Sequence, residues 1–171
     1  MPVLTDLNLL SQLEDEKREE NYFFRAFLEG KNSEETDALV FELNNNIAPQ
    51  IDCTRCGNCC KSLMVNITEP EAADLSILLD LSITDLKDKY IETSLQGNMI
   101  LNTIPCHFLK GTSCSIYEHR FTECREFPRL NRPGFTERLF STLMHYGRCP
   151  IIFNVVEALK KATGFTSPTE T

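Results

Sequence analysis

The stretch CTRCGNCC, residues 53–60, decides how this sequence is interpreted. It places four cysteines within eight residues: Cys53, Cys56, Cys59 and Cys60. Two cysteines separated by two residues can bind one metal ion, because the turn between them brings both sulfurs to the same side. Gly57 allows the tight backbone that such a turn needs. The stretch therefore predicts a thiolate site for a soft metal.

Four further cysteines lie far from this stretch: Cys106, Cys114, Cys124 and Cys149. Cys59 and Cys60 are adjacent, so we expect their sulfurs to point in different directions and to need ligands from elsewhere. The distal thiols can supply them, which makes all eight cysteines candidate metal ligands. Eight thiolates can form two four-cysteine zinc sites, one shared binuclear site, or one 4Fe-4S cluster with spare thiols.

The cellular compartment decides whether such cysteines form disulfides or bind metal. The N-terminal residues 1–20 lack the basic lead, apolar core and small-residue cleavage site of a secretory signal, so we expect a cytoplasmic protein. Reducing conditions favour metal binding over disulfides. The softness of sulfur leaves zinc, iron–sulfur and copper(I) as candidates, and zinc is the commonest occupant of closed thiolate sites. The fourth cysteine follows CTRCGNC at once, whereas a bacterial ferredoxin inserts three residues there, which argues against an ordinary ferredoxin.

Charge and hydropathy exclude two classes of partner. The chain carries 17 Lys and Arg against 25 Asp and Glu, a net charge of −8, which argues against general nucleic-acid binding. Most of this charge lies in residues 1–52, which hold 12 acidic and 4 basic side chains. No apolar stretch is long enough to span a bilayer. The predicted partner is therefore a metal ion, with no nucleic acid and no membrane.

Hydrophobic spacing predicts an α+β fold that is mainly helical. Leucines and phenylalanines recur at helical spacing before Gly30, and Ser33 is the predicted N-cap of a second helix. We therefore predict an N-terminal helical hairpin over residues 1–50, a cysteine-rich metal-binding domain with short strands over 51–165, and a disordered tail over 166–171.

Within the cysteine-rich region, capping signals and periodicity predict individual elements. Thr68 and Glu71 form a capping box that begins a helix. The other predicted elements are helices over residues 84–91, 117–127 and 151–163, and strands over residues 98–104 and 137–147.

Histidine and arginine side chains near the cysteines have both a site role and an ordinary role. His107 follows Cys106 and is a candidate ligand, although a polar loop histidine is the more common case. His119 and His145 have weaker claims. Four arginines can offset thiolate charge or simply form a solvated surface: Arg120, Arg125, Arg129 and Arg132.

The complete cysteine pattern resembles the CxxCxxCC cysteine-cluster family, which is described as zinc- or iron-chelating. The resemblance covers about residues 50–152 and rests on CTRCGNCC, CHFL (106–109), CSIYEHR (114–120), CREFP (124–128) and the final Cys149–Pro150. It implies that the eight cysteines are the family's own set. The chain departs from the pattern at Phe121, where the family usually has proline, and at His107.

The family is similar to part of the flagellin lysine-N-methylases, which use an iron–sulfur cluster. This similarity implies an alternative function, an iron–sulfur-dependent enzyme or accessory in protein lysine methylation. The residues themselves favour a metal-binding protein over an enzyme. The sequence contains no glycine-rich cofactor loop, no serine or histidine nucleophile arrangement and no three-cysteine radical-enzyme spacing.

Overall fold

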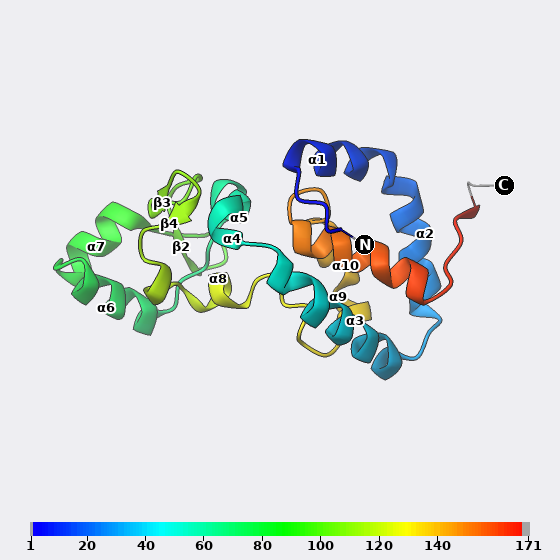
Figure 1. Ribbon diagram of the computed structural model, residues 1–171. Coiled ribbons are helices and arrows are strands. Elements are labelled where there is room, and N and C mark those ends of the chain that lie inside the picture. Colours follow the sequence, from blue (N-terminus) through cyan, green and yellow to red (C-terminus); the bar gives the residue numbers. More distant parts are fainter. Residues whose placement is uncertain (1, 169–171) are drawn as a thin grey trace. The chain divides into compact units, whose positions relative to one another are not determined.

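The structure is a computed structural model that describes residues 2–168 (Figure 1). Ten α-helices and two antiparallel hairpins of short strands are found in that part of the chain. The predicted class, α+β and mainly helical, is therefore confirmed.

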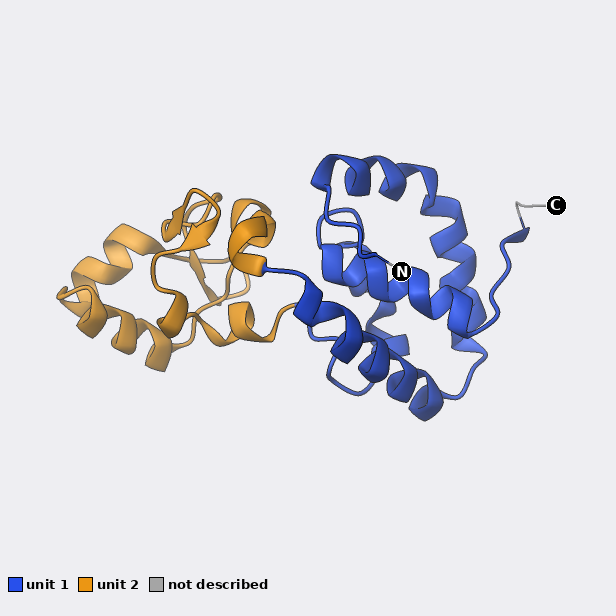
Figure 2. Ribbon diagram, in the orientation of Figure 1, with its two compact units in different colours: residues 1–52, 128–171 blue, residues 53–127 orange. Residues whose placement is uncertain are grey.

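The chain folds as two compact units, which Figure 2 shows in different colours. The helical unit combines residues 1–52 with residues 128–171, and the cysteine unit comprises residues 53–127. This grouping differs from the predicted one, in which residues 1–50 formed one segment and residues 51–165 formed the cysteine-rich domain. The reason is that the last two helices, α9 (Phe135–Leu143) and α10 (Pro150–Ala162), pack against the N-terminal helices.

The N-terminal part of the helical unit contains three helices: α1 (Leu7–Glu16), α2 (Arg18–Glu29) and α3 (Ser33–Ile47). The side chain of Asp6 caps α1 by accepting from Asn8 N at 2.9 Å. Asn32 caps α3, so the predicted N-cap Ser33 is instead its first helical residue. A short 3-10 turn (Ala48–Gln50) follows α3.

The predicted strand over residues 137–147 is wrong, because this segment forms α9 and the turn after it. Asp37 of α3 stabilises the helical conformation at the start of α9. Its buried carboxylate accepts from Gly134 N at 2.8 Å and from Phe135 N at 2.9 Å, which caps α9 from 97 residues away. Helical spacing buries Leu139, while Phe140 on the predicted strand face is exposed.

α10 confirms the predicted helix over residues 151–163 and supplies much of the core of the helical unit. The fully buried side chains there are Leu10, Phe24, Leu28, Val40, Phe135, Leu139, Tyr146, Val155, Val156 and Leu159. The predicted tail begins with exposed Thr166 and buried Ser167, and residues 169–171 lie outside the described part of the chain.

A partly buried network of charges, centred on the buried Lys160, joins α10 to the start of α2. Lys160 is 4% exposed, and its Nζ lies 2.7 Å from Glu20 Oε1 and 2.7 Å from Glu157 Oε1. Lys17 Nζ lies 3.0 Å from the other oxygen of each carboxylate. Tyr146 donates its hydroxyl to Glu157 Oε1 at 2.8 Å. Two cations thus match two anions inside the helical unit.

The cysteine unit contains shorter elements. Its helices are α4 (Cys53–Cys56), α5 (Asn58–Ser62), α6 (Glu69–Leu78), α7 (Ile83–Tyr90) and α8 (Thr122–Glu126), with a 3-10 turn at Tyr117–His119. Strand β1 (Ile91–Thr93) pairs with β2 (Met99–Leu101), and β3 (Leu109–Lys110) pairs with β4 (Ser113–Cys114), both antiparallel. The predicted capping box of Thr68 and Glu71 is confirmed at α6. The predicted helix over residues 117–127 is interrupted at Arg120.

One apolar cluster forms the core of the cysteine unit: Val65, Ile67, Ala72, Leu75, Leu86, Leu101, Phe108, Ile116 and Phe121. The partly buried Cys106, Cys114 and Cys124 pack against this cluster. Three of the predicted ligands thus pack against the apolar core of this unit.

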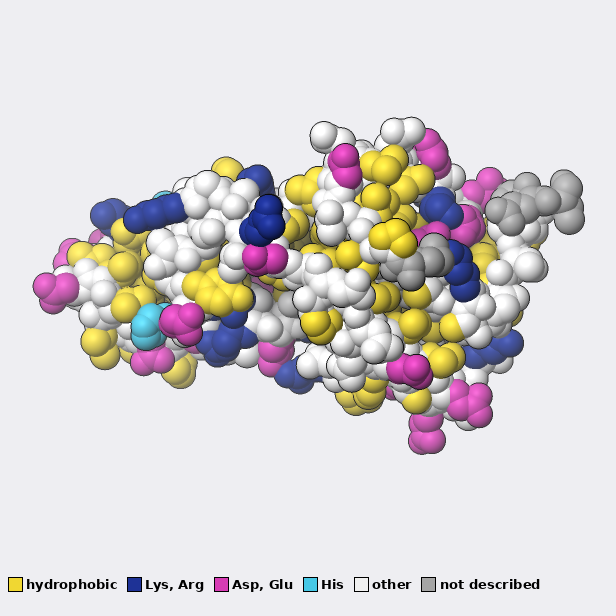
Figure 3. All heavy atoms as spheres, viewed as in Figure 1, with side chains coloured by type: hydrophobic (Ala, Val, Ile, Leu, Met, Phe, Trp, Pro, Cys, Tyr) yellow, Lys and Arg dark blue, Asp and Glu magenta, His cyan; other side chains and the backbone are white. Residues whose placement is uncertain are grey.

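On the face that Figure 3 shows, acidic and basic side chains are both present, and hydrophobic side chains are exposed between them. Within residues 2–168, none of the helices combines the length and the apolarity needed to cross a bilayer.

Candidate metal centre

The CTRCGNCC stretch folds as two short helical turns separated by a glycine. Cys53 and Cys56 begin and end α4, and Cys59 and Cys60 lie in α5. Gly57 joins the turns with φ +60° and donates its N–H to Cys53 O at 3.0 Å. This left-handed conformation favours glycine because it has no Cβ. The predicted tight turn at Gly57 is therefore confirmed.

Gly57 also allows the hairpin of β3 and β4 to lie directly on the turn. A Cβ at position 57 would lie 2.5 Å from Thr112 O and 2.9 Å from Thr112 Cα. Ser113 Oγ donates to Thr54 O at 3.1 Å, which ties the hairpin to α4. Through these contacts the first cysteine stretch and Cys114, which are more than fifty residues apart, become neighbours.

We expect Gly57→Ala to destabilise the cysteine unit by about 2–4 kcal/mol. A left-handed non-glycine residue costs roughly 1–2 kcal/mol, and overpacking against a backbone that cannot rotate away adds about 1–2 kcal/mol. Gly111→Ala is the matched control, because Gly111 has φ +65° and a Cβ added there would meet nothing within 4 Å. Urea denaturation of both variants measures the difference. Equal losses of stability in the two variants would show that the contact with Thr112 has no energetic weight.

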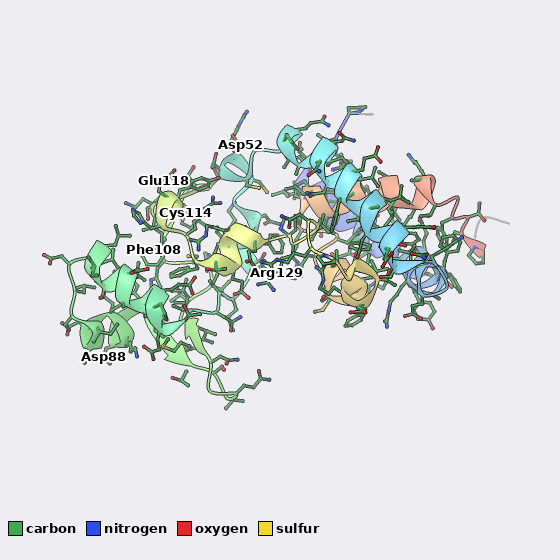
Figure 4. The ribbon with its side chains drawn as sticks, turned by 90° about the horizontal axis from the view of Figure 1, so that it is seen from below. Asp52, Asp88, Phe108, Cys114, Glu118 and Arg129 are labelled. Carbon is green, nitrogen blue, oxygen red and sulfur yellow. The ribbon has the colours of Figure 1, made fainter. Side chains whose placement is uncertain are left out.

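Backbone hydrogen bonds bring two of the distal cysteines, Cys106 and Cys114, to the same region. Cys106 N donates to Cys60 O at 2.8 Å, which joins the two cysteine segments directly. Ser115 N donates to Phe108 O at 2.7 Å, so the segments of Cys114 and Phe108, both labelled in Figure 4, lie side by side. Cys124 is the central residue of α8.

Cys59 and Cys60 lie closer to each other than the sequence suggested. Their sulfurs are 4.0 Å apart, whereas two ligands of one tetrahedral zinc are separated by about 3.8 Å. This distance does not support the expected divergence of the two sulfurs. The hydrogen bond from Cys59 lowers the pKa of Cys60 most, burial opposes it, and the charge of Arg120 lowers it further, to about 6. The surroundings of Cys60 thus favour its thiolate form.

The other three thiols of this region have raised pKa values. Burial raises the pKa of Cys124 most, and the charges of Cys60, Cys106 and Cys114 raise it further, to about 12. Burial is also the largest cause for Cys106, followed among the charges by Cys60 and Cys114. Burial and Cys60 raise the pKa of Cys114. We call Cys60, Cys106, Cys114 and Cys124 the four-thiol group, because their charges act on one another.

Arg120 is the cation that acts on the four-thiol group. Its guanidinium stacks on the ring of Tyr117, 3.6 Å from the ring centroid, and its Nε donates to Tyr117 O at 2.9 Å. Its charge lowers the pKa of both Cys60 and Cys114. The predicted offset of thiolate charge by arginine is therefore found at Arg120.

The remaining predicted arginines have other contacts. Arg125 donates to the backbone oxygen of Arg120 and, at 2.9 Å, to Thr122 Oγ1. It therefore supports the backbone of Arg120 and α8. Arg129 and Arg132 belong to the helical unit, where their backbone oxygens accept from Arg138 at 3.0 Å and 2.5 Å.

His107 makes contacts with Asn102 and Tyr90. His107 Nε2 lies 2.6 Å from Asn102 Oδ1, and Tyr90 packs edge-on against the His107 ring with centroids 4.9 Å apart. These contacts favour the ordinary role of a polar loop histidine for His107. His119 ends the 3-10 turn, and His145 belongs to the helical unit.

The eight predicted ligands therefore fall into three groups. The four-thiol group and its neighbour Cys59 are brought together. Cys53 is exposed and Cys56 is half-buried, both on α4 of the same unit. Cys149 is buried in the helical unit at the N-cap of α10.

The chemistry of the four-thiol group fits a soft metal. Among residues 2–168, no three His, Cys, Asp or Glu side chains converge closely enough to hold an ion. Three of these thiols nevertheless pack against one core cluster, and the backbone of Cys106 is hydrogen-bonded to that of Cys60. Sulfur donors favour zinc and iron over the hard cations magnesium and calcium.

Sequence reasoning missed the residue that holds α8 in place. Glu71 was identified as half of a capping box, but it also accepts from Thr122 N at 2.6 Å. No local pattern signals this contact, because it spans 51 residues.

A family model matches residues 52–149, which is more than half of the 171-residue chain. It is the CxxCxxCC model, with the description "Putative zinc- or iron-chelating domain". No curated protein and no solved structure matches the chain.

Proposed function

Because the chain belongs to the CxxCxxCC family, we propose that it binds zinc or iron through a centre built on the four-thiol group. The observation that carries this proposal is the placement of four cysteines in one unit: Cys106 N donates to Cys60 O at 2.8 Å, and Cys106, Cys114 and Cys124 pack against one core cluster. Four thiolates are a complete ligand set for tetrahedral zinc and for one 4Fe-4S cluster.

Different residues of the cysteine unit have different roles in such a centre. Cys60 provides the first thiolate, and Arg120 stabilises its charge. Cys106, Cys114 and Cys124 release their protons as the cation binds, since a metal ligand must be deprotonated. Core packing of these three side chains restricts how far their sulfurs move.

The other cysteines extend the same proposal. Three further thiols lie in α4 and α5 of the same unit, those of Cys53, Cys56 and Cys59. They are the additional ligands that a second metal site, or a site shared by two metals, would use. Cys149 as the eighth ligand stays a prediction. Thiolate ligands require reduced cysteines, so we also propose a reducing compartment, as in the cytosol.

Serine substitution of each member of the four-thiol group tests the centre. We expect each single variant to contain less than half the metal of the wild type, because a hydroxyl is a poor ligand for a soft metal. Elemental analysis and visible absorption of anaerobically purified protein measure the metal and distinguish zinc from iron. Cys149→Ser in the same series reports whether the eighth thiol contributes. Full metal content in all four variants would place the centre elsewhere.

The alternative function, an iron–sulfur enzyme or accessory in lysine methylation, rests on the resemblance described for the sequence. The same measurements test its premise. Zinc as the native metal would remove this alternative, whereas a cluster spectrum would keep it.

A further inference from the structure

Helix α8 carries Cys124 but is too short to hold its own position. It has five residues, and an isolated helix of this length is unstable in water. Its orientation must therefore come from contacts with longer elements. Two of these contacts are made by side-chain carboxylates.

The first contact is made by Glu71, in the first turn of α6. Its Oε1 accepts from Thr122 N, the first residue of α8, at 2.6 Å. Its Oε2 accepts from Thr68 N at 2.9 Å and from Thr68 Oγ1 at 2.8 Å. Both oxygens are thus occupied, one by each helix start. Burial opposes ionisation, but the N–H groups of Thr122 and Thr68 outweigh it and lower the pKa of Glu71 to about 2.

The second contact reinforces the first. Glu123 of α8 accepts from Asn66 N at 2.6 Å and from Asn66 Nδ2 at 3.1 Å. Asn66 and Glu71 flank the start of α6, so both contacts attach α8 to the same place. α6 itself is anchored, because Ala72 and Leu75 belong to the core cluster of the unit.

We propose that Glu71 is a positioning residue of the metal centre, which joins the start of α6 to the start of α8 and so holds Cys124 for metal binding. This role rests on the proposed function, since it requires Cys124 to be a ligand. Glu71 does not touch the metal. It acts through Thr122, two residues before Cys124.

Glu71→Gln distinguishes the contact of Glu71 with Thr68 from its contact with Thr122. The amide has one acceptor oxygen in place of two. Because glutamine retains a capping box, this oxygen is expected to stay with Thr68, which leaves the N–H of Thr122 without its acceptor. Glu69→Gln is the matched control. It removes the same charge from the same helical turn, but the Glu69 carboxylate pairs with Lys87, at 2.9 Å.

Thr122→Pro tests the same contact from the other side. Proline is well tolerated at the first helical position and removes the N–H that Glu71 accepts. Phe121 has φ −56° and ψ 151°, an extended conformation that suits a residue before proline. Thr122→Val separates the role of the N–H from that of the hydroxyl. Valine retains the N–H but loses the hydroxyl, which accepts from Arg125 and also contributes to the lowered pKa of Glu71.

Zinc affinity of the full-length reduced protein, measured by competition with a chromophoric chelator, tests the proposal. We expect Glu71→Gln and Thr122→Pro to weaken zinc binding about tenfold, as is typical when the support of a metal ligand is lost. Glu69→Gln is expected to stay within about twofold of the wild type, because it leaves the contact between Glu71 and Thr122 intact. Thr122→Val is expected to lose less affinity than Thr122→Pro, because valine retains the N–H that Glu71 accepts.

A double variant distinguishes positioning of Cys124 from a general loss of stability. If Glu71 acts through Cys124, adding Glu71→Gln to Cys124→Ser should cause no further loss of zinc affinity. An equal loss in both backgrounds, or unchanged affinity in Glu71→Gln and Thr122→Pro, overturns the positioning role alone. A wild-type chain that takes up neither zinc nor iron overturns the proposed function, and the positioning role with it.

Discussion

Removal of the bound metal by a strong chelator is expected to unfold the cysteine unit, while the helical unit keeps its structure. The core cluster of the cysteine unit has nine buried side chains, and α4, α5 and α8 have four or five residues each. A single small core supplies about 3–5 kcal/mol, whereas a structural zinc site supplies about 10–16 kcal/mol. Loss of the metal therefore removes most of the stabilising free energy of this unit.

Hydrogen exchange followed by mass spectrometry can localise the effect. We expect the amides of residues 53–127 to lose protection in chelator under reducing conditions. The amides of α3 and α10 should keep theirs, because the core and the charge network of the helical unit contain no proposed four-thiol ligand. Restoring zinc is the control for reversibility. Unchanged protection of residues 53–127 in verified metal-free protein would contradict this prediction.

Lys160→Met is expected to destabilise the helical unit by about 3 kcal/mol, the lower end of the cost of breaking a buried ion pair, because Glu20 and Glu157 are partly exposed. Methionine fills nearly the same volume but leaves Glu20 and Glu157 with Lys17 as their remaining cation. Urea denaturation measures the loss. Lys161→Met is the control, because Lys161 is the next residue of α10 and is exposed.

The pH dependence of the same variant gives a second check. Burial raises the pKa of Glu157, but Lys160, Lys17 and Tyr146 outweigh it and leave the pKa below 4.5. A lowered pKa stabilises the fold above the unfolded value, and this stabilisation disappears as the pH falls through the folded value. In metal-free protein, the difference between wild type and Lys160→Met should therefore shrink below about pH 4.5. A difference that grows on acidification would contradict the assigned charges.

Local features of this protein were predictable because their causes lie within a few residues. Thr68 and Glu71 are three positions apart, so their capping box is visible in the sequence and is found at α6. Gly57 lies between two cysteine pairs, where only a tight turn brings the sulfurs together. The apolar spacing of residues 151–163 likewise predicted α10.

Features that depend on distant partners were not predictable. The segment of α9 alternates well enough for a strand, and the carboxylate of Asp37 that caps it comes from 97 residues away. Residues 128–165 were predicted to belong to the cysteine-rich domain. Instead, α9 and α10 pack against the N-terminal helices, a contact between segments far apart in the chain.

The sequence by itself determined the kind of centre, because thiol spacing and the softness of sulfur depend on residue type and order alone. The tertiary structure decided which thiols lie in one unit. Cys106 N is hydrogen-bonded to Cys60 O, and the first residue of α8, the helix that carries Cys124, donates to a carboxylate of α6. Such contacts depend on the packing of α6, α8 and the β3–β4 hairpin around one apolar core, and spacing along the chain carries no record of them.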